Sequence, residues 1–542
     1  MRKISYTILA FMLCLVALFS SYSPAQAEVK SDYKLYVMAP LGEVTDWDSF
    51  KKQLVQLKES GVYALTTDVW WGLVEGNGDN QFDWSYYKKY AEVVESSGLK
   101  WVPIMSTHQC GGNVGDDCNY PLPTWIWDED SVENMAFKSE SGYLNKEALA
   151  PWWDEATGQY NELYKSFAKN FADKKSLIVK IYLSGGPAGE LRYPSYQFAD
   201  GWDYPERGQL QAYTEGAKKD FRRAIKEKYA TLKKLNTAWG TKLKNWNQIQ
   251  PPNNGDEFFT SGEAYSSQYG KDFMEWYQGA LEDHLQKIAK VAHKQFDSTF
   301  NVPIGAKISG VHWKMNDPEM PHAAEYSTGY YNYSQLLDQF KKSDLAITFT
   351  CLEMGDHDAY NAPYYSAPRK LVTQIANLAN ERGISLNGEN ALPLINNEWG
   401  FDNSAEVVFN YNFEGFTLLR MTYLFNDEGN PTNEFNMMRD KLGVKSVPVT
   451  FTVNNVPSAA GQGVYLTGAR GEIGRWNPAE YEYKLTQNSD GNWSGTFNLG
   501  ADRLYEFKFV LKDANGNITW QHGDNNSYHT PSTGVGEYSS SW

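Results

Sequence analysis

The sequence predicts an α/β fold, a (β/α)8 TIM barrel with long βα-loop insertions, followed by a C-terminal all-β sandwich domain. Between about residues 34 and 425, apolar runs alternate with amphipathic helical stretches, which is the pattern of a parallel sheet. After Val444 the helical periodicity gives way to short alternating runs separated by Asn, Gly and Asp turns. A chain of 542 residues accommodates a large barrel and a small second domain.

Eight apolar runs are candidates for the barrel strands. Phe50, Leu54 and Leu57 recur at helical spacing, and the chain then passes through Gly61 into the second run. Gly98 and Gly383 precede later runs in the same way, at positions where a helix C-cap is expected. We expect long, functional insertions after the third, fourth and fifth strands. The predicted strands are 34–39, 63–70, 99–107, 177–184, 302–311, 345–352, 384–389 and 414–423.

The N-terminus has the features of an export signal. Arg2 and Lys3 precede an apolar stretch, and residues 25–27 (Ala-Gln-Ala) form a small-x-small cleavage site. No later run approaches the ~18 to 20 apolar residues that a membrane span needs. The prediction is therefore a secreted, extracellular monomer with a signal peptide (1–27), a catalytic barrel (28–446) and a β-sandwich (447–542).

The composition argues against anionic partners. The formal net charge is -16, and this sign repels phosphate, so nucleic acid and anionic membranes are poor candidates. Aromatic residues make up 15% of the chain, with 19 Trp and 36 Tyr. Their ring faces can stack on neutral sugar rings, although core packing explains part of the excess.

Three cysteines remain after removal of the signal. Cys110 and Cys118 enclose a short Gly-rich loop, and in an oxidising compartment we expect a disulfide between them. A metal site is less favoured, because the sequence has no second Cys pair and no His-x3-His spacing. Cys351 lies in an apolar run without a basic neighbour, which favours a buried structural thiol over a nucleophile.

Polar residues end seven of the predicted strands, and in a parallel barrel such residues meet at one mouth. Each alone has a structural explanation as a helix cap or a loop anchor. Glu190 and Glu389 stand out because each follows a glycine in a tight turn. Two opposed carboxyls are the equipment for glycoside hydrolysis, one as acid and one as base or nucleophile. Glu353 is a rival carboxylate.

Seven runs closely resemble the β-amylases, glycoside hydrolase family fourteen, over roughly residues 33 to 430. They are DVWWG (68–72), HQCGGNVGD (108–116), GGPAGELRYPSY (185–196), KISGVHW (307–313), FTCLEM (349–354), LNGEN (386–390) and LLRMTY (418–423). The resemblance implies an inverting exo-hydrolase that releases β-maltose from the non-reducing ends of starch and maltooligosaccharides.

The resemblance also assigns roles to residues. It implies that Glu190 is the general acid and Glu389 the general base. It places Thr350 on a mobile inner loop. It places Gly111, Gly112 and Gly115 in a flexible lid; the alternative is that this segment is a surface turn tied by the disulfide. The implied substrate-binding residues are Asp68, His108, Asp116, Lys307, His312, Thr350, Asn390 and Arg420.

Bacterial members of the family carry a calcium site, and the resemblance implies a structural Ca2+ here. Hard oxygen ligands suit calcium. The alternative is an ordinary Gly/Asn-rich turn. Gln159 is neutral where the family commonly offers Glu. The matching residues are Glu75, Asp79, Asn80, Gln159 and Glu162.

The C-terminal segment resembles a family-twenty starch-binding module in its runs EIGRWNP, YEFKF and ITWQHGDNN. The resemblance implies one sugar site, with two indoles as a stacking platform. The alternative is that both Trp residues belong to the sandwich core. A second site is depleted, because Ala460 occupies a position where a tyrosine is expected. The implied site residues are Trp476, Lys508, Trp520 and Asn525.

Two other functions stay open on sequence alone. A retaining β-glycosidase also places an acid after strand four and a nucleophile after strand seven, but usually has Asn directly before the acid, where this chain has Gly189. The carboxyl separation distinguishes the two, at ~5 Å for retaining and ~6.5 to 9.5 Å for inverting enzymes. A catalytically silent starch-adhesion protein is the second alternative, and the presence of both glutamates argues against it.

Overall fold

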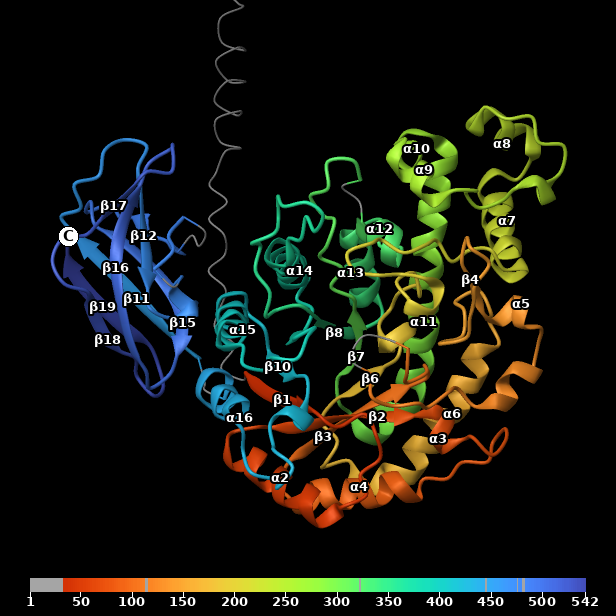
Figure 1. Ribbon diagram of the computed structural model, residues 1–542, viewed down its shortest axis with the longest axis horizontal. Helices are drawn as coiled ribbons and strands as arrows, with labels where there is room; N and C mark the ends of the chain where they lie inside the picture. Colours follow the sequence, from red (N-terminus) through yellow and green to blue (C-terminus); the bar gives the residue numbers. More distant parts are fainter. Residues whose placement is uncertain (1–32, 113–115, 321–322, 444–445, 475, 480–482) are drawn as a thin grey trace, which may run out of the picture.

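A closed parallel barrel forms the larger part of the molecule. The computed structural model describes residues 33–112, 116–320, 323–443, 446–474, 476–479 and 483–542. Eight strands close in the order β1-β10-β9-β8-β7-β6-β3-β2, so that barrel strands that follow one another in the sequence are neighbours (Figure 1). Each predicted run contains one barrel strand, which confirms the fold class. The strands are β1 (Lys34–Met38), β2 (Ala64–Trp70), β3 (Lys100–Ser106), β6 (Ile181–Leu183), β7 (Ile304–Ile308), β8 (Leu345–Phe349), β9 (Leu386–Glu389) and β10 (Gly415–Leu418).

Helices surround the barrel and fill its insertions. None within the described ranges has the length and apolar content that crossing a membrane requires. The α-helices are α2 (Trp47–Glu59), α3 (Trp71–Val74), α4 (Ser85–Ser96), α5 (Val132–Met135), α6 (Ala156–Phe171), α7 (Glu215–Tyr229), α8 (Leu232–Trp239), α9 (Gly255–Thr260), α10 (Glu263–Ser266), α11 (Gln268–Phe300), α12 (Ala323–Thr328), α13 (Tyr333–Lys342), α14 (Pro368–Arg382), α15 (Glu398–Asn410) and α16 (Asn433–Met437). The shorter helical turns are η1 (Thr124–Asp128), η2 (Ala172–Lys174), η3 (Pro187–Gly189), η4 (Phe198–Asp200), η5 (Trp246–Gln248), η6 (Met421–Tyr423), η7 (Met438–Leu442) and η8 (Gly471–Ile473).

The first helix shows how local sequence fixes an element. Phe50, Leu54 and Leu57 form the buried stripe of α2, and the Asp46 side chain caps its start by accepting a hydrogen bond from the Ser49 amide. Gly61 follows the helix at φ +97°, a conformation that side-chain-bearing residues rarely adopt. The helical pattern and its terminating glycine are thus confirmed.

The long insertions lie where the sequence predicts them. The segment between β3 and α6 holds η1, α5 and a small hairpin of β4 (Phe137–Lys138) and β5 (Leu144–Asn145). The segment between β6 and α11 carries α7 to α10, and the one between β7 and α13 carries α12. In Figure 1 the insertion from α7 to α10 extends to the upper right, away from the barrel strands.

The C-terminal part is a β-sandwich with its own core. One sheet has the order β14-β15-β11-β19, and the other has the order β13-β12-β16-β17 with β18 paired to β16. Phe451, Leu466 and Phe507 belong to a buried cluster separate from the barrel core. The predicted all-β domain is confirmed, and the predicted division at residue 446 falls at its first strand. The strands are β11 (Ser446–Asn454), β12 (Gly463–Gly468), β13 (Tyr483–Lys484), β14 (Thr486–Gln487), β15 (Trp493–Gly500), β16 (Leu504–Lys512), β17 (Ile518–Trp520), β18 (Asn526–His529) and β19 (Gly536–Ser541).

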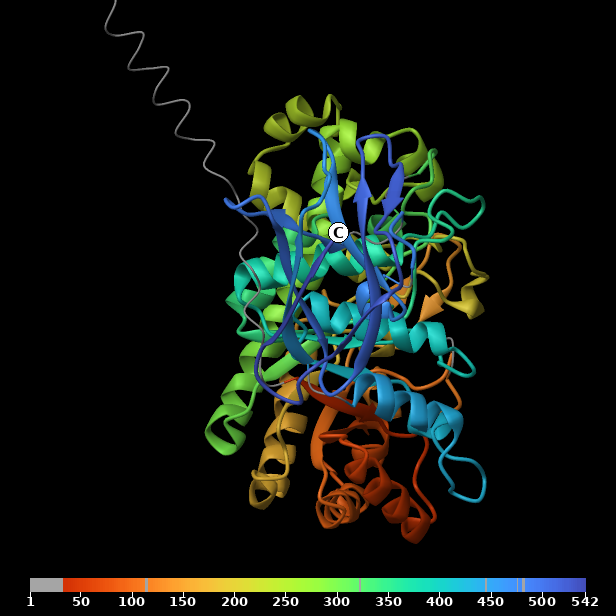
Figure 2. The ribbon, with the colours of Figure 1, turned by 90° about the vertical axis from the view of Figure 1, so that its left-hand side faces the viewer.

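The sandwich docks against the barrel through α15. This helix packs on η8 and β15; Figure 1 shows the two domains side by side, and in Figure 2 the sandwich lies in front of the barrel. The Tyr483 hydroxyl donates a 2.6 Å hydrogen bond to Oε1 of Glu406 on α15, and Glu406 also pairs with Arg369 at the start of α14. These three side chains therefore make a polar contact across the junction, and the Tyr483–Glu406 bond is buried.

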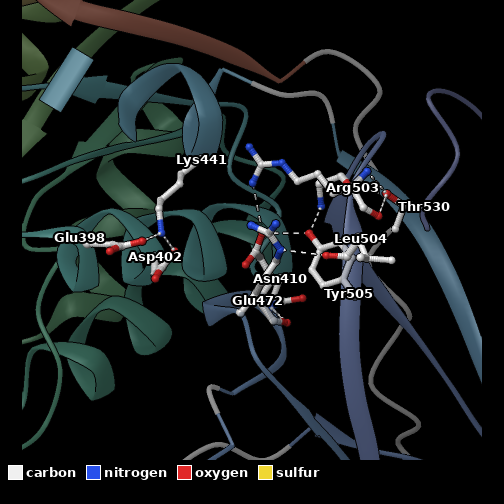
Figure 3. A network of polar contacts seen from close by, with 11 residues as sticks. Glu398, Asp402, Asn410, Lys441, Glu472, Arg503, Leu504, Tyr505 and Thr530 are labelled. Atoms are coloured by element: carbon white, nitrogen blue, oxygen red, sulfur yellow. Dashed lines mark hydrogen bonds and ion pairs between the residues drawn. The ribbon is translucent and has the colours of Figure 1, made fainter. Parts of the chain in front are cut away.

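A second set of polar contacts flanks this junction (Figure 3). Asn410 donates to the Glu472 carbonyl at 3.4 Å, and Tyr505 donates to the Glu472 carboxylate at 2.9 Å. On the barrel side, Lys441 pairs with Glu398 and with Asp402 on α15, at 2.9 and 2.5 Å. The domains are held by packed side chains as well as by the chain connection.

Replacing Tyr483 by Phe tests the junction. The change removes one buried hydrogen bond to a charged group, so we expect the free energy of unfolding to fall by about 1 to 3 kcal/mol. Urea denaturation followed by fluorescence measures it. Tyr465→Phe, in the same sandwich, is the matched control, and an equal loss in both variants would contradict a specific contribution of the Tyr483–Glu406 bond.

Candidate active site

Glu190 and Glu389 both contact Lys307 of β7. The backbone of Glu190 bridges to that of Lys307 in β7, with the Leu191 amide donating to the Lys307 carbonyl at 2.9 Å. Glu389 ends β9, and the Lys307 ammonium donates to both of its carboxylate oxygens at 2.8 Å. The side chain of Lys307 thus binds the carboxylate of Glu389, and its main chain pairs with the backbone at Glu190.

The Glu190 carboxyl is held by a buried arginine. Arg192 Nε donates to Glu190 Oε2 at 2.8 Å, and its guanidinium lies 4.1 Å from the ring centroid of Tyr196. Burial opposes the charge on Arg192, but Tyr196 and Glu190 together hold its pKa above the ordinary value. The Tyr196 hydroxyl lies 3.5 Å from the same Glu190 oxygen. The sequence patterns indicate no role for Arg192 or Tyr196. Arg192 lies two positions after Glu190, and alternate residues of an extended backbone share a side, so this spacing could have signalled Arg192.

Glu389 is a buried carboxyl with opposing electrostatic influences. Its side chain is almost fully enclosed, and burial raises its pKa, while Lys307 and Arg420 act in the opposite direction. The charge of Glu190 adds to the upward shift of this pKa. Among the described residues, no hydrogen bond joins the carboxyls of Glu190 and Glu389.

Glu353, the rival carboxylate, supports the loop that follows Glu389. It is 3% exposed and accepts hydrogen bonds from the amides of Ala391 and Leu392 at 2.8 to 3.1 Å. Burial raises its pKa to about 7, against the effect of these bonds. Its oxygens are engaged by backbone, so Glu353 positions the segment after Glu389.

Two predicted substrate-binding histidines are buried and neutral. Burial, with Lys307 and Arg192 nearby, lowers the pKa of His108 to about 3, and burial lowers that of His312 to about 4. Nδ1 of His108 lies 2.8 Å from the Ser184 hydroxyl, and Nδ1 of His312 lies 2.7 Å from that of Ser366. Neutral imidazoles oriented in this way can exchange hydrogen bonds with sugar hydroxyls.

The glycine before Glu190 is required by its surroundings. Gly189 has φ +75°, and a Cβ there would lie 3.2 Å from Cε1 of His108. An asparagine, which the retaining alternative usually has at this place, would meet both the strained backbone and the His108 ring. The local geometry therefore explains why glycine stands directly before Glu190.

The structure gives each remaining predicted substrate-binding residue a specific environment. Asp68 accepts from the Ser106 hydroxyl at 2.7 Å, and Thr350 accepts from the Gly310 amide at 3.0 Å. The side-chain amide of Asn390 donates to the carbonyl of Leu419 and accepts from its backbone N–H; Leu419 directly precedes Arg420. Nη1 of Arg420 is buried with no hydrogen-bond partner among the described residues.

The predicted disulfide joins Cys110 and Cys118 and ties down the loop that carries Asp116. Asp116 Oδ2 accepts from the Gly111 amide at 2.8 Å. Gly112 lies beside Gln197 of the loop after Glu190, whereas Gly115 falls outside the described residues, and the lid stays a prediction. Cys351 is a buried free thiol whose pKa is raised mainly by burial, which agrees with a structural role.

Four of the five predicted calcium ligands are linked. Asn80 donates its backbone amide to Glu75 at 2.7 Å, and its side-chain amide to Asp79 and Glu162 at 3.1 and 2.9 Å. The Gln159 amide oxygen, one helical turn from Glu162, is buried without a partner among the described residues. No three His, Cys, Asp or Glu side chains in that part of the chain are arranged to hold a metal by themselves, so amide oxygens would have to contribute.

The predicted sugar site of the sandwich lies at its surface. The rings of Trp476 and Trp520 are 6.4 Å apart, and Trp520 is 39% exposed. Neither belongs to the buried cluster, which contradicts the alternative that both are core residues. Lys508 donates to the carbonyls of Gln521 and Gly523 beside them, and Asn525 is exposed.

Comparison with known proteins decides the family. Residues 36–448 match the model of glycosyl hydrolase family 14. The chain belongs to glycosyl hydrolase family 14. Residues 446–540 match a starch binding domain. A thermophilic beta-amylase from Thermoanaerobacterium thermosulfurigenes is 50% identical over 100% of this chain and 98% of its own. A beta-amylase from Cytobacillus firmus is 56% identical over 82% of this chain and 95% of its own.

A solved structure agrees with this assignment. The catalytic domain of beta-amylase from Paenibacillus polymyxa shares 57% identity, covers 76% of this chain and 98% of its own, and superimposes with a TM-score of 0.74. The family-14 enzyme therefore combines a barrel typical of these hydrolases with a starch-binding sandwich.

Replacing Lys307 by Met tests its effect on Glu389. Without the ammonium, the burial of Glu389 loses its main compensation, so the pKa rises further and the carboxylate becomes protonated at higher pH. A general base must be ionised, so we expect the acidic limb of the kcat/KM profile on maltopentaose to move upward by roughly one to three pH units. Lys341→Met on α13 is the control, and an unmoved limb in Lys307→Met would refute this role.

Proposed function

We propose that this starch-degrading glycoside hydrolase acts as an exo-acting, inverting enzyme that releases β-maltose from the non-reducing ends of α-1,4-glucans. The proposal is carried by one observation, the different cation partners of the two glutamates: Lys307 binds the Glu389 carboxylate, and Arg192 binds the Glu190 carboxylate. Two carboxyls in different electrostatic environments can divide the acid and base roles. The family and the starch-binding domain agree with starch as the substrate.

The two carboxyls act on opposite sides of the scissile bond. Glu190 gives its proton to the glycosidic oxygen, and Arg192 stabilises the carboxylate that this transfer leaves behind. Glu389, whose ionised form Lys307 and Arg420 favour against the effect of burial on its pKa, takes a proton from the water that attacks the anomeric carbon. Attack from the face opposite the leaving group inverts that carbon, and the water needs a carboxyl separation of ~6.5 to 9.5 Å.

The surrounding groups orient the sugar. Arg420 offers its buried Nη1 as a donor, and neutral His108 and His312 offer ring nitrogens. In the sandwich, Trp476 and Trp520 supply ring faces for a glucan, with Lys508 and Asn525 at their edge. This arrangement supports one starch site that concentrates the enzyme on raw starch.

Replacing Glu389 by Gln tests the proposed function. The amide cannot accept the proton of water, so we expect kcat on soluble starch to fall by about 10²- to 10⁴-fold while adsorption to starch granules stays unchanged. Glu381→Gln, at an exposed position on α14, is the control for the substitution itself. Substantial turnover by Glu389→Gln would exclude the assigned base, and loss of adsorption would contradict independent binding by the sandwich.

We also propose that Ca2+ binds at Glu75, Asp79, Asn80, Gln159 and Glu162. Burial raises the pKa of Glu75 to about 7, and Asp79 and Glu162 add repulsion that a cation would relieve. The cluster lies beyond the end of β2 and makes no contact with Glu190 or Glu389 among the described residues, so the ion would stabilise the fold and take no part in the reaction.

Chelation tests the calcium proposal. We expect EDTA to lower the Tm by roughly 2 to 8 °C and added Ca2+ to restore it, with little change of activity at 25 °C. The variant Asp79→Asn should show a smaller response to EDTA. An unchanged Tm of the wild-type protein after exhaustive chelation would rule out the site.

Export and a monomeric state are also proposed. The export signal falls on residues 1–27, outside the described residues, and its support is the basic, apolar and small-residue pattern of the sequence. A substrate too large to enter a cell fits a secreted enzyme.

A further inference from the structure

A series of aromatic rings leads from the general acid to the outside of the barrel mouth. Tyr196, beside Glu190, lies 5.3 Å from Trp313 between ring centroids. Trp313 lies 5.9 Å from Tyr204, and Tyr204 stacks on Tyr364 at 5.9 Å with an interplanar angle of 23°. These rings come from the loops that follow β6, β7 and β8.

Exposure increases along the series. Trp313 is 7% exposed, whereas Tyr204 is 43% and Tyr364 is 40% exposed. The outer pair, Tyr204 and Tyr364, is called the rim pair below. Two stacked tyrosines that are open to solvent contribute less hydrophobic stabilisation than buried rings do. Packing alone therefore explains poorly why these two rings lie at the surface.

The rim pair is held in place by the loops around the site. The Lys314 amide donates to the Tyr364 carbonyl at 2.8 Å, and the Ala367 amide donates to the His312 carbonyl at 2.9 Å. Trp313 is fixed by its indole N–H, which donates to the Glu206 carbonyl at 2.9 Å. The backbone at Tyr364 is thus held and its ring is stacked on Tyr204, so this ring has less conformational freedom to lose when it binds a ligand.

We propose that the rim pair binds the outgoing part of the substrate, the glucosyl units on the reducing-end side of those that Glu190 and Glu389 contact. This proposal rests on the proposed exo action. When the non-reducing end is enclosed at the carboxyls, the remaining glucan has to leave through the mouth, and the aromatic series leads outward from Glu190. The C–H faces of a neutral glucan complement tyrosine ring faces, and the acidic chain disfavours anionic ligands.

The rim pair thereby sets a preference for longer chains. A glucan that ends near the carboxyls cannot reach Tyr364, whereas a longer one can stack there. Affinity gained outside the reacting bond is common to the ground state and the transition state, so it lowers KM without changing kcat.

Kinetics on two chain lengths test this proposal. In the full chain carrying Trp520→Ala, which weakens the sandwich site, we expect Tyr364→Ala to raise KM for maltoheptaose by about fivefold and to change KM for maltotetraose less than twofold, with kcat unchanged. Tyr364→Phe keeps the ring and should behave like its parent.

Tyr360→Ala is the second control, because Tyr360 lies on the same loop with its ring under Lys370 and outside the series. An equal change for both substrates, an equal effect of Tyr360→Ala, or no change in Tyr364→Ala would each overturn the proposal. If the parent enzyme hydrolyses neither oligosaccharide, the proposed function fails and this inference fails with it, which is a distinct result.

Discussion

The ion pair between Lys307 and Glu389 is the interaction on which the site depends. Burying a carboxylate is costly, and Glu389 is buried at the end of a strand, where a nearby cation opposes the rise in pKa that burial causes. Lys307 supplies that cation from β7, and the backbone of the same residue adjoins Glu190. The register of one central strand therefore fixes both carboxyls relative to each other, and the packed barrel holds that register.

The starch-binding sandwich is joined to the outer helices of the barrel. It docks on α15, which follows β9 and Glu389, and its Tyr483 reaches Glu406, the partner of Arg369 on α14. The helix α14 follows β8, whose end leads to Thr350. The binding domain thus contacts α15 directly and is linked through Glu406 to Arg369 of α14, so it is joined to the helices that follow two strands carrying site residues.

Much of this architecture could be predicted from the sequence. Eight apolar runs sufficed for the barrel strands because parallel strands are buried on both faces, and polar strand ends identified the mouth. Only Arg192, two residues after Glu190, had a signal in the spacing of the sequence. The backbone bonds that engage Glu353 and the contact of Tyr483 with Glu406 depend on loop paths and domain docking, which residue patterns do not encode.

The anomeric configuration of the first product decides whether the enzyme inverts or retains, because it reports whether water or a carboxylate attacks the anomeric carbon. Proton NMR of maltopentaose hydrolysis, recorded before mutarotation, distinguishes the anomers of the released maltose. The account predicts that β-maltose appears first and that the α-anomer grows only later. Initial release of α-maltose would contradict it, since Glu389 would then act as a nucleophile.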